Sequence, residues 1–259
     1  MRLTDRMSAD AVLVETAGPV GRVTLNAPER LNAVDPAMCG RVTEAVRAFD
    51  ADPAVRVIAL GGAGRGFCSG APLSADGATA GTLFAGAELV RTLLGSRTPV
   101  VALVHGVAAG IGVPMALACD YVLASDAASF VLAFARIGLM PDGGATALVA
   151  ASVGRARAMR LALTGEKLDA VTAAEWGLVA ECVPAAEFQE RAAALLAALA
   201  KGPTVALAET KAAVNAASVD VAGALGREEA GQSALMHTAD YREGVAAFLA
   251  KRTASFTGA

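Results

Sequence analysis

The sequence predicts an α/β protein in which a mostly parallel core sheet is followed by a helical C-terminal region. Two observations carry this prediction. Up to about residue 143, short β-branched runs alternate with stretches of helical periodicity, which is typical of right-handed strand–helix–strand crossovers. Beyond that point, alanine-rich helical segments continue nearly to the last residue, and only residues 179–183 interrupt them with a strand-like pattern.

The first elements are two strands and a helix. Residues 12–15 and 22–26 alternate apolar and polar side chains, as strands do, and a Gly-Pro pair between them favours a turn. Asp35 followed by Pro36 is typical of a helix start, because aspartate caps free N–H groups and proline fits the first turn. The apolar residues of this helix share one face: Met38, Val42, Ala45, Val46 and Phe49.

The middle of the chain alternates buried strands with helices. Residues 55–60 form a β-branched run that ends in two glycines, and residues 100–104 form a second such run. Between them, residues 80–94 have helical spacing. Two more strand-like runs follow at 120–124 and 129–133. This order predicts parallel strands joined by crossovers.

The C-terminal helices are expected in three stretches, 187–200, 204–217 and 219–251, with a Gly-Pro break between the first two. We therefore divide the chain into an α/β core, residues 1–190, and a helical region, residues 191–259.

Composition and charge exclude several classes of function. The chain has 22 basic and 25 acidic residues, so nothing indicates nucleic-acid binding or attraction to an anionic membrane. Four widely spaced cysteines and two histidines form no metal-ligand pattern. Residues 100–119 are uncharged and have the length of a membrane span, but their glycines and Pro114 favour a buried strand, turn and helix. Residues 1–10 lack an apolar signal core, so we expect a cytoplasmic protein.

Two glycine-rich turns follow buried strands, at residues 61–73 and 105–112. Neither is a phosphate-binding P-loop, because no Gly-Lys-Ser/Thr follows. Glycine lets backbone N–H groups approach a ligand closely, so two such turns could aim two N–H groups at one oxygen and form an oxyanion hole. The alternative is that these glycines only make tight turns.

Asp142 is a lone carboxylate in a long apolar neighbourhood. One role for it is the N-cap of a helix that opens at Gly143. The other is a general base whose pKa is raised by apolar burial. The residues alone leave both roles open.

Four segments resemble, in the right order, the crotonase superfamily, that is, the enoyl-CoA hydratase/isomerase family. They are 22–33 (RVTLNAPERLNA), 64–71 (GRGFCSGA), 105–112 (HGVAAGIG) and 241–252 (YREGVAAFLAKR), and the similarity covers essentially the whole chain. The resemblance implies a crotonase-like spiral of ββα units. It implies an acyl-CoA thioester as substrate, with no separate cofactor, and a helical region that assembles a homotrimer or a dimer of trimers.

The same resemblance assigns roles to particular residues. The N–H groups of Ala71 and Ile111 would hold the thioester oxygen and stabilise an enolate. Arg30 would approach the CoA phosphates, since a guanidinium fork suits a phosphate, unless it is only an exposed turn residue. Phe248 and Lys251 would enclose CoA from a neighbouring subunit, unless their helix is simply amphipathic. The full set of implied CoA contacts is Arg30, Leu31, Ala33, Ser69, Phe248 and Lys251.

Two departures from the family pattern decide the expected chemistry. Hydratases of the family activate water with two glutamates, and the matching positions here are Pro114 and Phe134, which cannot move a proton. The chain is most similar to the ring-1,2-epoxyphenylacetyl-CoA isomerase branch, which places its working carboxylate at the position of Asp142. We therefore expect an acyl-CoA isomerase with Asp142 as acid and base, acting on a double bond or a ring epoxide. The alternatives are an enoyl-CoA hydratase and a catalytically silent acyl-CoA-binding protein.

Overall fold

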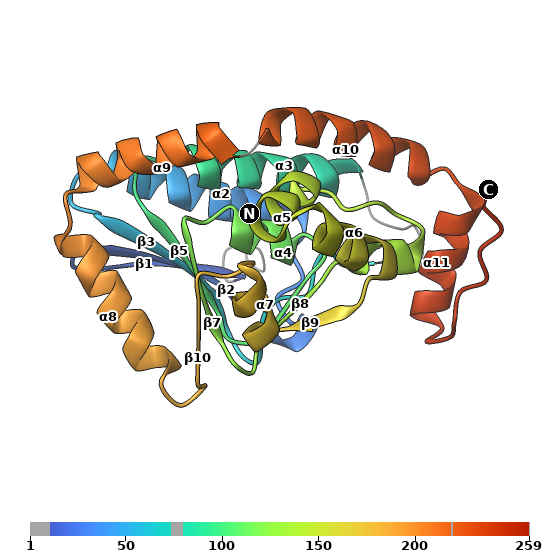
Figure 1. The fold of residues 1–259 in the computed structure, drawn as a ribbon, viewed down its shortest axis with the longest axis horizontal. Helices are drawn as coiled ribbons and strands as arrows, with labels where there is room; N and C mark the ends of the chain where they lie inside the picture. The colour runs from blue at the N-terminus through green and yellow to red at the C-terminus, as the bar shows by residue number, and fades with distance from the viewer. Residues whose placement is uncertain (1–10, 74–79, 219, 259) are drawn as a thin grey trace, which may run out of the picture.

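The computed structural model describes residues 11–73, 80–218 and 220–258 (Figure 1). Residues 1–10, on which the expectation about a signal sequence rests, lie outside the described residues.

Two sheets form the core of the described chain. The larger has the strand order β1-β2-β3-β5-β7-β10, parallel throughout except for the β1–β2 hairpin. The smaller has the order β4-β6-β8-β9, with β9 antiparallel to β8. The strands of the larger sheet are β1 (Val12–Ala17), β2 (Val20–Leu25), β3 (Val57–Gly62), β5 (Val100–Val104), β7 (Tyr121–Ser125) and β10 (Glu181–Val183). Those of the smaller are β4 (Gly66–Cys68), β6 (Val107–Ala109), β8 (Ser129–Val131) and β9 (Lys167–Asp169).

The chain builds these sheets as a spiral. Each of the strand pairs β3/β4, β5/β6 and β7/β8 places its first strand in the larger sheet and its second in the smaller. A helical segment follows each pair: α3 (Ala80–Gly95), then α4 (Gly112–Leu117), then the 3₁₀ helix η2 (Ala133–Ile137) with α5 (Ala145–Val153). The expected spiral of ββα units is confirmed.

Some details differ from the expectation. Strands β4 and β6 lie inside the segments interpreted as glycine turns, and β9 was not anticipated. The equally short β8 and β10 were anticipated because they lie in longer strand-like runs, whereas β4 and β6 lie inside glycine-rich segments and β9 has a single apolar residue. Gly61 and Gly62, which we expected to follow this strand, are the last two residues of β3.

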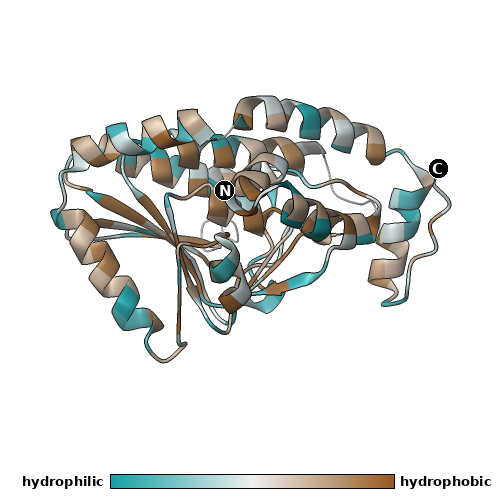
Figure 2. Ribbon diagram, viewed as in Figure 1, coloured by the Kyte–Doolittle hydropathy of each residue, from teal (hydrophilic) through white to brown (hydrophobic). Residues whose placement is uncertain are grey.

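Helix α2 (Pro36–Ala51) begins and packs as expected. The Asp35 carboxylate accepts a hydrogen bond from the Met38 N–H at 2.9 Å, which satisfies one of the free donors of the first turn. Its buried face includes the five apolar residues named from the sequence. In Figure 2 the strands of the larger sheet are mostly brown, whereas the outer helices mix brown and teal.

The C-terminal helices cover the core of their own chain. They are α8 (Phe188–Lys201), α9 (Thr204–Ser218), α10 (Val221–Leu235) and α11 (Ala239–Leu249), preceded by α6 (Arg155–Thr164) and α7 (Ala170–Trp176). Helix α8 packs on the larger sheet through Leu195 and Leu196, while α10 lies along α3 and α5 and α11 contacts η2 (Figure 1). The boundary at residue 190 and a role of this region in oligomerisation stay predictions.

The uncharged segment 100–119 forms β5, β6 and α4, as the sequence favoured. No individual helix of the described chain has both the length and the apolar character needed to cross a membrane. The pair α8 and α9 meets those two criteria jointly, but it is bent by 104° at its break.

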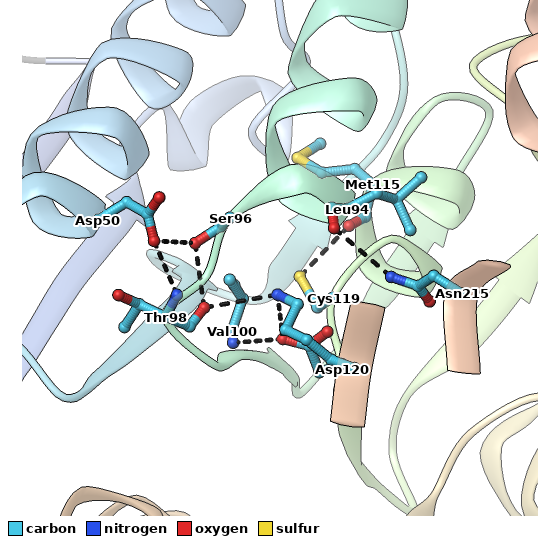
Figure 3. Close-up of polar contacts among 10 residues, drawn as sticks. Asp50, Leu94, Ser96, Thr98, Val100, Met115, Cys119, Asp120 and Asn215 are labelled. Atoms are coloured by element: carbon cyan, nitrogen blue, oxygen red, sulfur yellow. Dashed lines mark hydrogen bonds and ion pairs between the residues drawn. The ribbon is translucent and has the colours of Figure 1, made fainter. Parts of the chain in front are cut away.

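Polar side chains hold the segment that enters β5 (Figure 3). Asp50, near the end of α2, accepts a hydrogen bond from the Thr98 N–H at 2.7 Å. Asp120 accepts one from the Val100 N–H at 2.7 Å and pairs with the Lys211 ammonium group at 2.7 Å. Because Lys211 lies in α9, this ion pair ties the helical region to the core sheet.

Lys211→Met is expected to lower the free energy of unfolding by about 3 kcal/mol, because it leaves Asp120 as a buried carboxylate without its cation. Only 8% of the Lys211 side chain and 20% of the Asp120 side chain are exposed, so solvent screens the pair weakly. Urea unfolding measures the loss, with Lys201→Met at an exposed position on α8 as the control. A loss below about 1 kcal/mol would mean that the pair behaves like a surface ion pair.

Candidate active site

A cavity of about 220 Å³ lies between the two glycine turns, η2 and the C-terminal helices. Asp142 is the single carboxylate among the described residues that line it. Five of the residues predicted from the sequence are on its wall: Ser69, Ala71, Ile111, Asp142 and Phe248. Apolar side chains form most of the remaining wall: Leu73, Leu83, Phe134, Ile137, Leu139 and Met236. The polar side chains on the wall besides Asp142 and Ser69 are Thr82, Arg136 and Gln232, so the cavity suits a largely apolar group with few polar contacts.

The smaller sheet brings the two glycine turns together. Strands β4 and β6 are parallel neighbours, so the chain leaves both at the same edge. The residues that follow, Gly70 and Gly110, have φ of +105° and +54°, which favour glycine. A Cβ atom on Gly110 would lie 3.4 Å from the Gly70 Cα, so the two backbones are in contact. Ala71 and Ile111, one residue further on, therefore lie close together.

The backbone N–H groups of Ala71 and Ile111 belong to residues on the cavity wall. Neither donates a hydrogen bond to another group in the described part of the chain, and both residues line the cavity. Two neighbouring N–H groups at a largely apolar cavity can stabilise a negative oxygen strongly when both point at it, because little water competes for them. This geometry favours the oxyanion-hole interpretation over simple tight turns.

Asn32 fixes the first glycine turn, and sequence reasoning missed it. Its side chain is fully buried; its Oδ1 accepts from the Ala27 N–H at 2.9 Å, and its Nδ2 donates to the carbonyls of Ala63 and Gly66 at 2.9 and 2.8 Å. Its φ of +57° is one that asparagine tolerates better than most residues. The signal in the sequence that could have pointed to Asn32 is its place in a segment rich in residues that favour turns.

The residues expected to contact CoA form the turn beside Ser69. The Ser69 N–H donates to the Leu31 carbonyl at 2.9 Å, and its hydroxyl donates to the Arg30 carbonyl at 3.0 Å. The Arg30 guanidinium is partly exposed and bonds the Asp35 carboxylate at 3.2 Å. Ala33 is buried in the same turn. Their roles in CoA binding stay predictions.

Two further predicted contacts lie at the end of α11. Phe248 is 60% exposed and lines the cavity of its own chain, whereas the resemblance implied a contact across a subunit boundary. Lys251 follows the helix at an exposed position, with a φ of +52°. Their contribution to CoA binding also stays a prediction.

The structure excludes one of the two roles considered for Asp142, and the role of general base stays a prediction. Helix α5 begins at Ala145 with Gly144 as its N-cap, so the N-cap interpretation of Asp142 is wrong. Its Oδ2 accepts a hydrogen bond from the Gln232 Nε2 at 2.9 Å, and its buried Oδ1 has no partner among the described residues. Burial raises the pKa of this carboxyl to about 6; the Gln232 hydrogen bond opposes the rise and the charge of Glu228 adds to it. Such a carboxylate can exchange protons near neutral pH.

The two positions that carry glutamates in hydratases of the family are apolar in this fold. Pro114 is buried in the first turn of α4, where a missing N–H is tolerated. Phe134 is buried in η2 and lines the cavity. A mechanism in which two carboxylates activate one water has no side chains to use at these positions.

Other reactive groups are ruled out or secondary. Cys68 lies beside the first turn, but burial raises the pKa of its thiol to about 12, which is unsuited to a nucleophile. Within the described residues, no three side chains of the kinds that bind metals gather into a potential metal site.

A spiral of ββα units with paired glycine turns at one edge of the smaller sheet defines a crotonase fold. The known proteins agree. The family described as enoyl-CoA hydratase/isomerase matches residues 15–259. This chain is 42% identical over 246 residues to 1,2-epoxyphenylacetyl-CoA isomerase of Escherichia coli K12, covering 91% of this chain and 94% of that protein.

Other relatives are named as hydratases. A probable enoyl-CoA hydratase of Rhodobacter capsulatus is 41% identical over 259 residues, covering 97% of this chain and all of that protein. The crystal structure of an enoyl-CoA hydratase from Mycobacterium avium subsp. paratuberculosis superposes with a TM-score of 0.91 at 46% identity, covering 95% of this chain and 98% of that one. The chain belongs to the enoyl-CoA hydratase/isomerase family and is an enzyme of that family, for which an acyl-CoA thioester is the implied substrate.

Proposed function

We propose that this enzyme is an acyl-CoA isomerase that uses Asp142 as its single acid and base. The observation that carries the proposal is a carboxylate of raised pKa in a cavity also lined by Ala71 and Ile111, whose N–H groups have no hydrogen-bond partner among the described residues. The apolar residues at the two glutamate positions support isomerisation over hydration, since only one proton-transferring group is required.

The proposed step starts at the carbon next to the thioester carbonyl. The N–H groups of Ala71 and Ile111 hydrogen-bond the carbonyl oxygen and so acidify that carbon. The Asp142 carboxylate takes its proton, and the electron pair of the broken C–H bond delocalises onto the oxygen as an enolate. The protonated Asp142 carboxyl, which can exchange its proton with water, then delivers a proton to the γ-carbon of a 3-enoyl thioester, which leaves the double bond in the 2-position. Asp142 ends as a carboxylate, no water is consumed, and no cofactor beyond the CoA of the substrate is needed.

The cavity wall and the relatives both bear on the identity of the acyl group. Phe134, Leu139 and Met236 give the cavity an apolar wall that suits a compact hydrocarbon group. The similarity to 1,2-epoxyphenylacetyl-CoA isomerase supports a cyclic substrate. The similar identity to a probable enoyl-CoA hydratase makes hydration the second candidate.

A paired turnover assay separates the two candidates. The purified enzyme receives a 3-enoyl-CoA and a 2-enoyl-CoA separately, and mass spectrometry identifies the products. We expect the 3-enoyl thioester to be converted without a change of mass and the 2-enoyl thioester to gain no water. A water adduct from the 2-enoyl thioester would contradict the proposal. If neither thioester is converted, the ring epoxide is the next substrate to assay. A CoA-binding titration then identifies a protein that binds without turnover.

A further inference from the structure

Helix α10 contacts Asp142 although the two are 90 residues apart in the chain. Gln232 lines the cavity, is fully buried and donates to the Asp142 Oδ2 at 2.9 Å. That bond occupies one carboxylate oxygen, so Oδ1, which has no hydrogen-bond partner among the described residues, is the oxygen left to exchange a proton. A buried amide that holds one oxygen of a base restricts the rotation of its carboxyl group.

One turn earlier on α10, Glu228 anchors the segment that follows Asp142. Its carboxylate is 1% exposed and accepts hydrogen bonds from the N–H groups of Gly144 and Thr146 at 2.5 and 2.9 Å. It also accepts one from the Thr146 hydroxyl at 2.5 Å. These donors belong to the start of α5, where the free N–H groups of a helix favour a negative charge. Burial raises the pKa of the Glu228 carboxyl, and the hydrogen bonds from Thr146 and Gly144 oppose that rise. When ionised, Glu228 adds a negative charge near Asp142.

The segment before Asp142 is held against the same helix. A Cβ atom on Gly231 would overlap the sulfur of Met140, so only glycine lets Met140 pack this closely on α10. Contacts on both sides of Asp142 thus come from one helix, through Gly231, Gln232 and Glu228.

We propose that Gln232 is the positioning residue of Asp142 and that Glu228 sets its electrostatic surroundings, so that α10 of the same chain prepares the base for proton transfer. The inference rests on the proposed function, in which Asp142 moves the proton. It assigns to the helical region a part in the chemistry, in addition to covering the core.

The two residues act on the pKa of Asp142 in opposite directions. The hydrogen bond from Gln232 favours the charged carboxylate and lowers the pKa, whereas the negative charge of Glu228 raises it. Other ionisable groups in these surroundings are Arg227, which acts on Glu228 from the next position of α10; Arg136, exposed on η2 at the cavity wall; and the Cys39 thiol of α2, whose pKa burial raises to about 12, so that it stays neutral. None of these contacts Asp142 as Gln232 does.

The experiment compares the pH dependence of kcat/KM for Gln232→Met and Glu228→Gln with the wild-type enzyme. The wild-type rate should rise through about pH 6, where Asp142 loses its proton. We expect this rising limb of the pH profile of kcat/KM to move to higher pH in Gln232→Met and to lower pH in Glu228→Gln, each by about half a pH unit or more. In Gln232→Met, kcat should also fall about tenfold with little change of KM, because orientation is lost and ligand contacts are kept.

Matched controls are available in the same chain. Gln189→Met lies on the exposed face of α8, and Glu229→Gln removes a neighbouring carboxylate of α10 that pairs with Arg91. Both should keep the wild-type pH profile. Where Glu228→Gln fails to fold, ¹³C NMR titration of labelled aspartate in Gln232→Met, assigned through Asp142→Asn, reads the pKa of Asp142 without turnover.

The outcomes separate this inference from the proposed function. Opposite shifts with unmoved controls support it. An unchanged limb in Gln232→Met, or shifts in the same direction for both variants, would overturn it while leaving Asp142 as the base. Wild-type turnover in Asp142→Asn would instead overturn the proposed function on which it rests.

Discussion

Asp142→Asn is expected to lower kcat by about 10²–10⁴-fold, the usual contribution of a general base, while leaving the dissociation constant of a CoA thioester nearly unchanged. Asparagine has nearly the same shape and keeps an oxygen for the Gln232 hydrogen bond, but it cannot take up a proton. Steady-state turnover of a 3-enoyl-CoA and calorimetric binding of an unreactive CoA thioester measure the two quantities. Asp52→Asn, at an exposed position after α2, is the control.

The stability of the Asp142→Asn variant provides an internal check. Burial raises the folded-state pKa of Asp142 to about 6, above the value in the unfolded chain. The folded protein therefore binds the proton more tightly, and this stabilisation is lost as the pH rises through about 6. At about pH 7.5 the variant should unfold at a temperature equal to or above that of the wild type, with the difference narrowing in acid. A variant that is inactive because it is misfolded would unfold at a lower temperature.

Ile111→Pro is expected to lower kcat by about 10²–10³-fold, because it removes one of the two proposed oxyanion donors. The backbone is suited to this substitution: Ile111 has a φ of −60°, which proline adopts without strain, and Gly110 before it is conformationally free. The effect should appear in kcat more than in KM, since the oxygen carries most charge in the enolate.

The side chain of Ile111 requires its own control. It packs close to Gly86 and Gly143, where Cβ atoms would meet it. Ile111→Ala removes most of that side chain and keeps the N–H group, so it should retain at least tenfold more activity than Ile111→Pro, about 1.4 kcal/mol of transition-state stabilisation. Equal losses in the two variants would assign the effect to packing and remove Ile111 from the oxyanion hole.

The larger sheet was predictable because its strands carry their own signals. The runs that became β3 and β5 are β-branched and uncharged, and α2 displays a cap and one apolar face. Of the smaller sheet only β8 was predicted, because β4 and β6 lie inside glycine-rich segments, β9 has a single apolar residue, and all three are held by pairing between distant segments. Local patterns contain no trace of such pairing.

The residues of the candidate site were also predictable only in part. Ala71, Ile111 and Asp142 follow from motifs, and they line one cavity. Excluding the cap role of Asp142 needed the true start of α5, and its bond to Gln232, 90 residues away, could not be predicted from local sequence. A sequence signal for α10 did exist: Glu228 and Gln232 are four residues apart, on a helix face that also buries Leu225. Buried polar side chains at helical spacing point to a specific polar contact.

The central claim is that Asp142 takes a proton from the carbon next to a thioester carbonyl held by two N–H groups. Its most direct test is hydrogen exchange at that carbon, with the enzyme and a 3-enoyl-CoA in deuterated water and the recovered thioesters weighed by mass spectrometry. We expect the wild-type enzyme to introduce deuterium and Asp142→Asn to introduce none above the uncatalysed rate. Exchange that persists in Asp142→Asn would contradict the claim, as would turnover by the wild type in which hydration is the only change of mass.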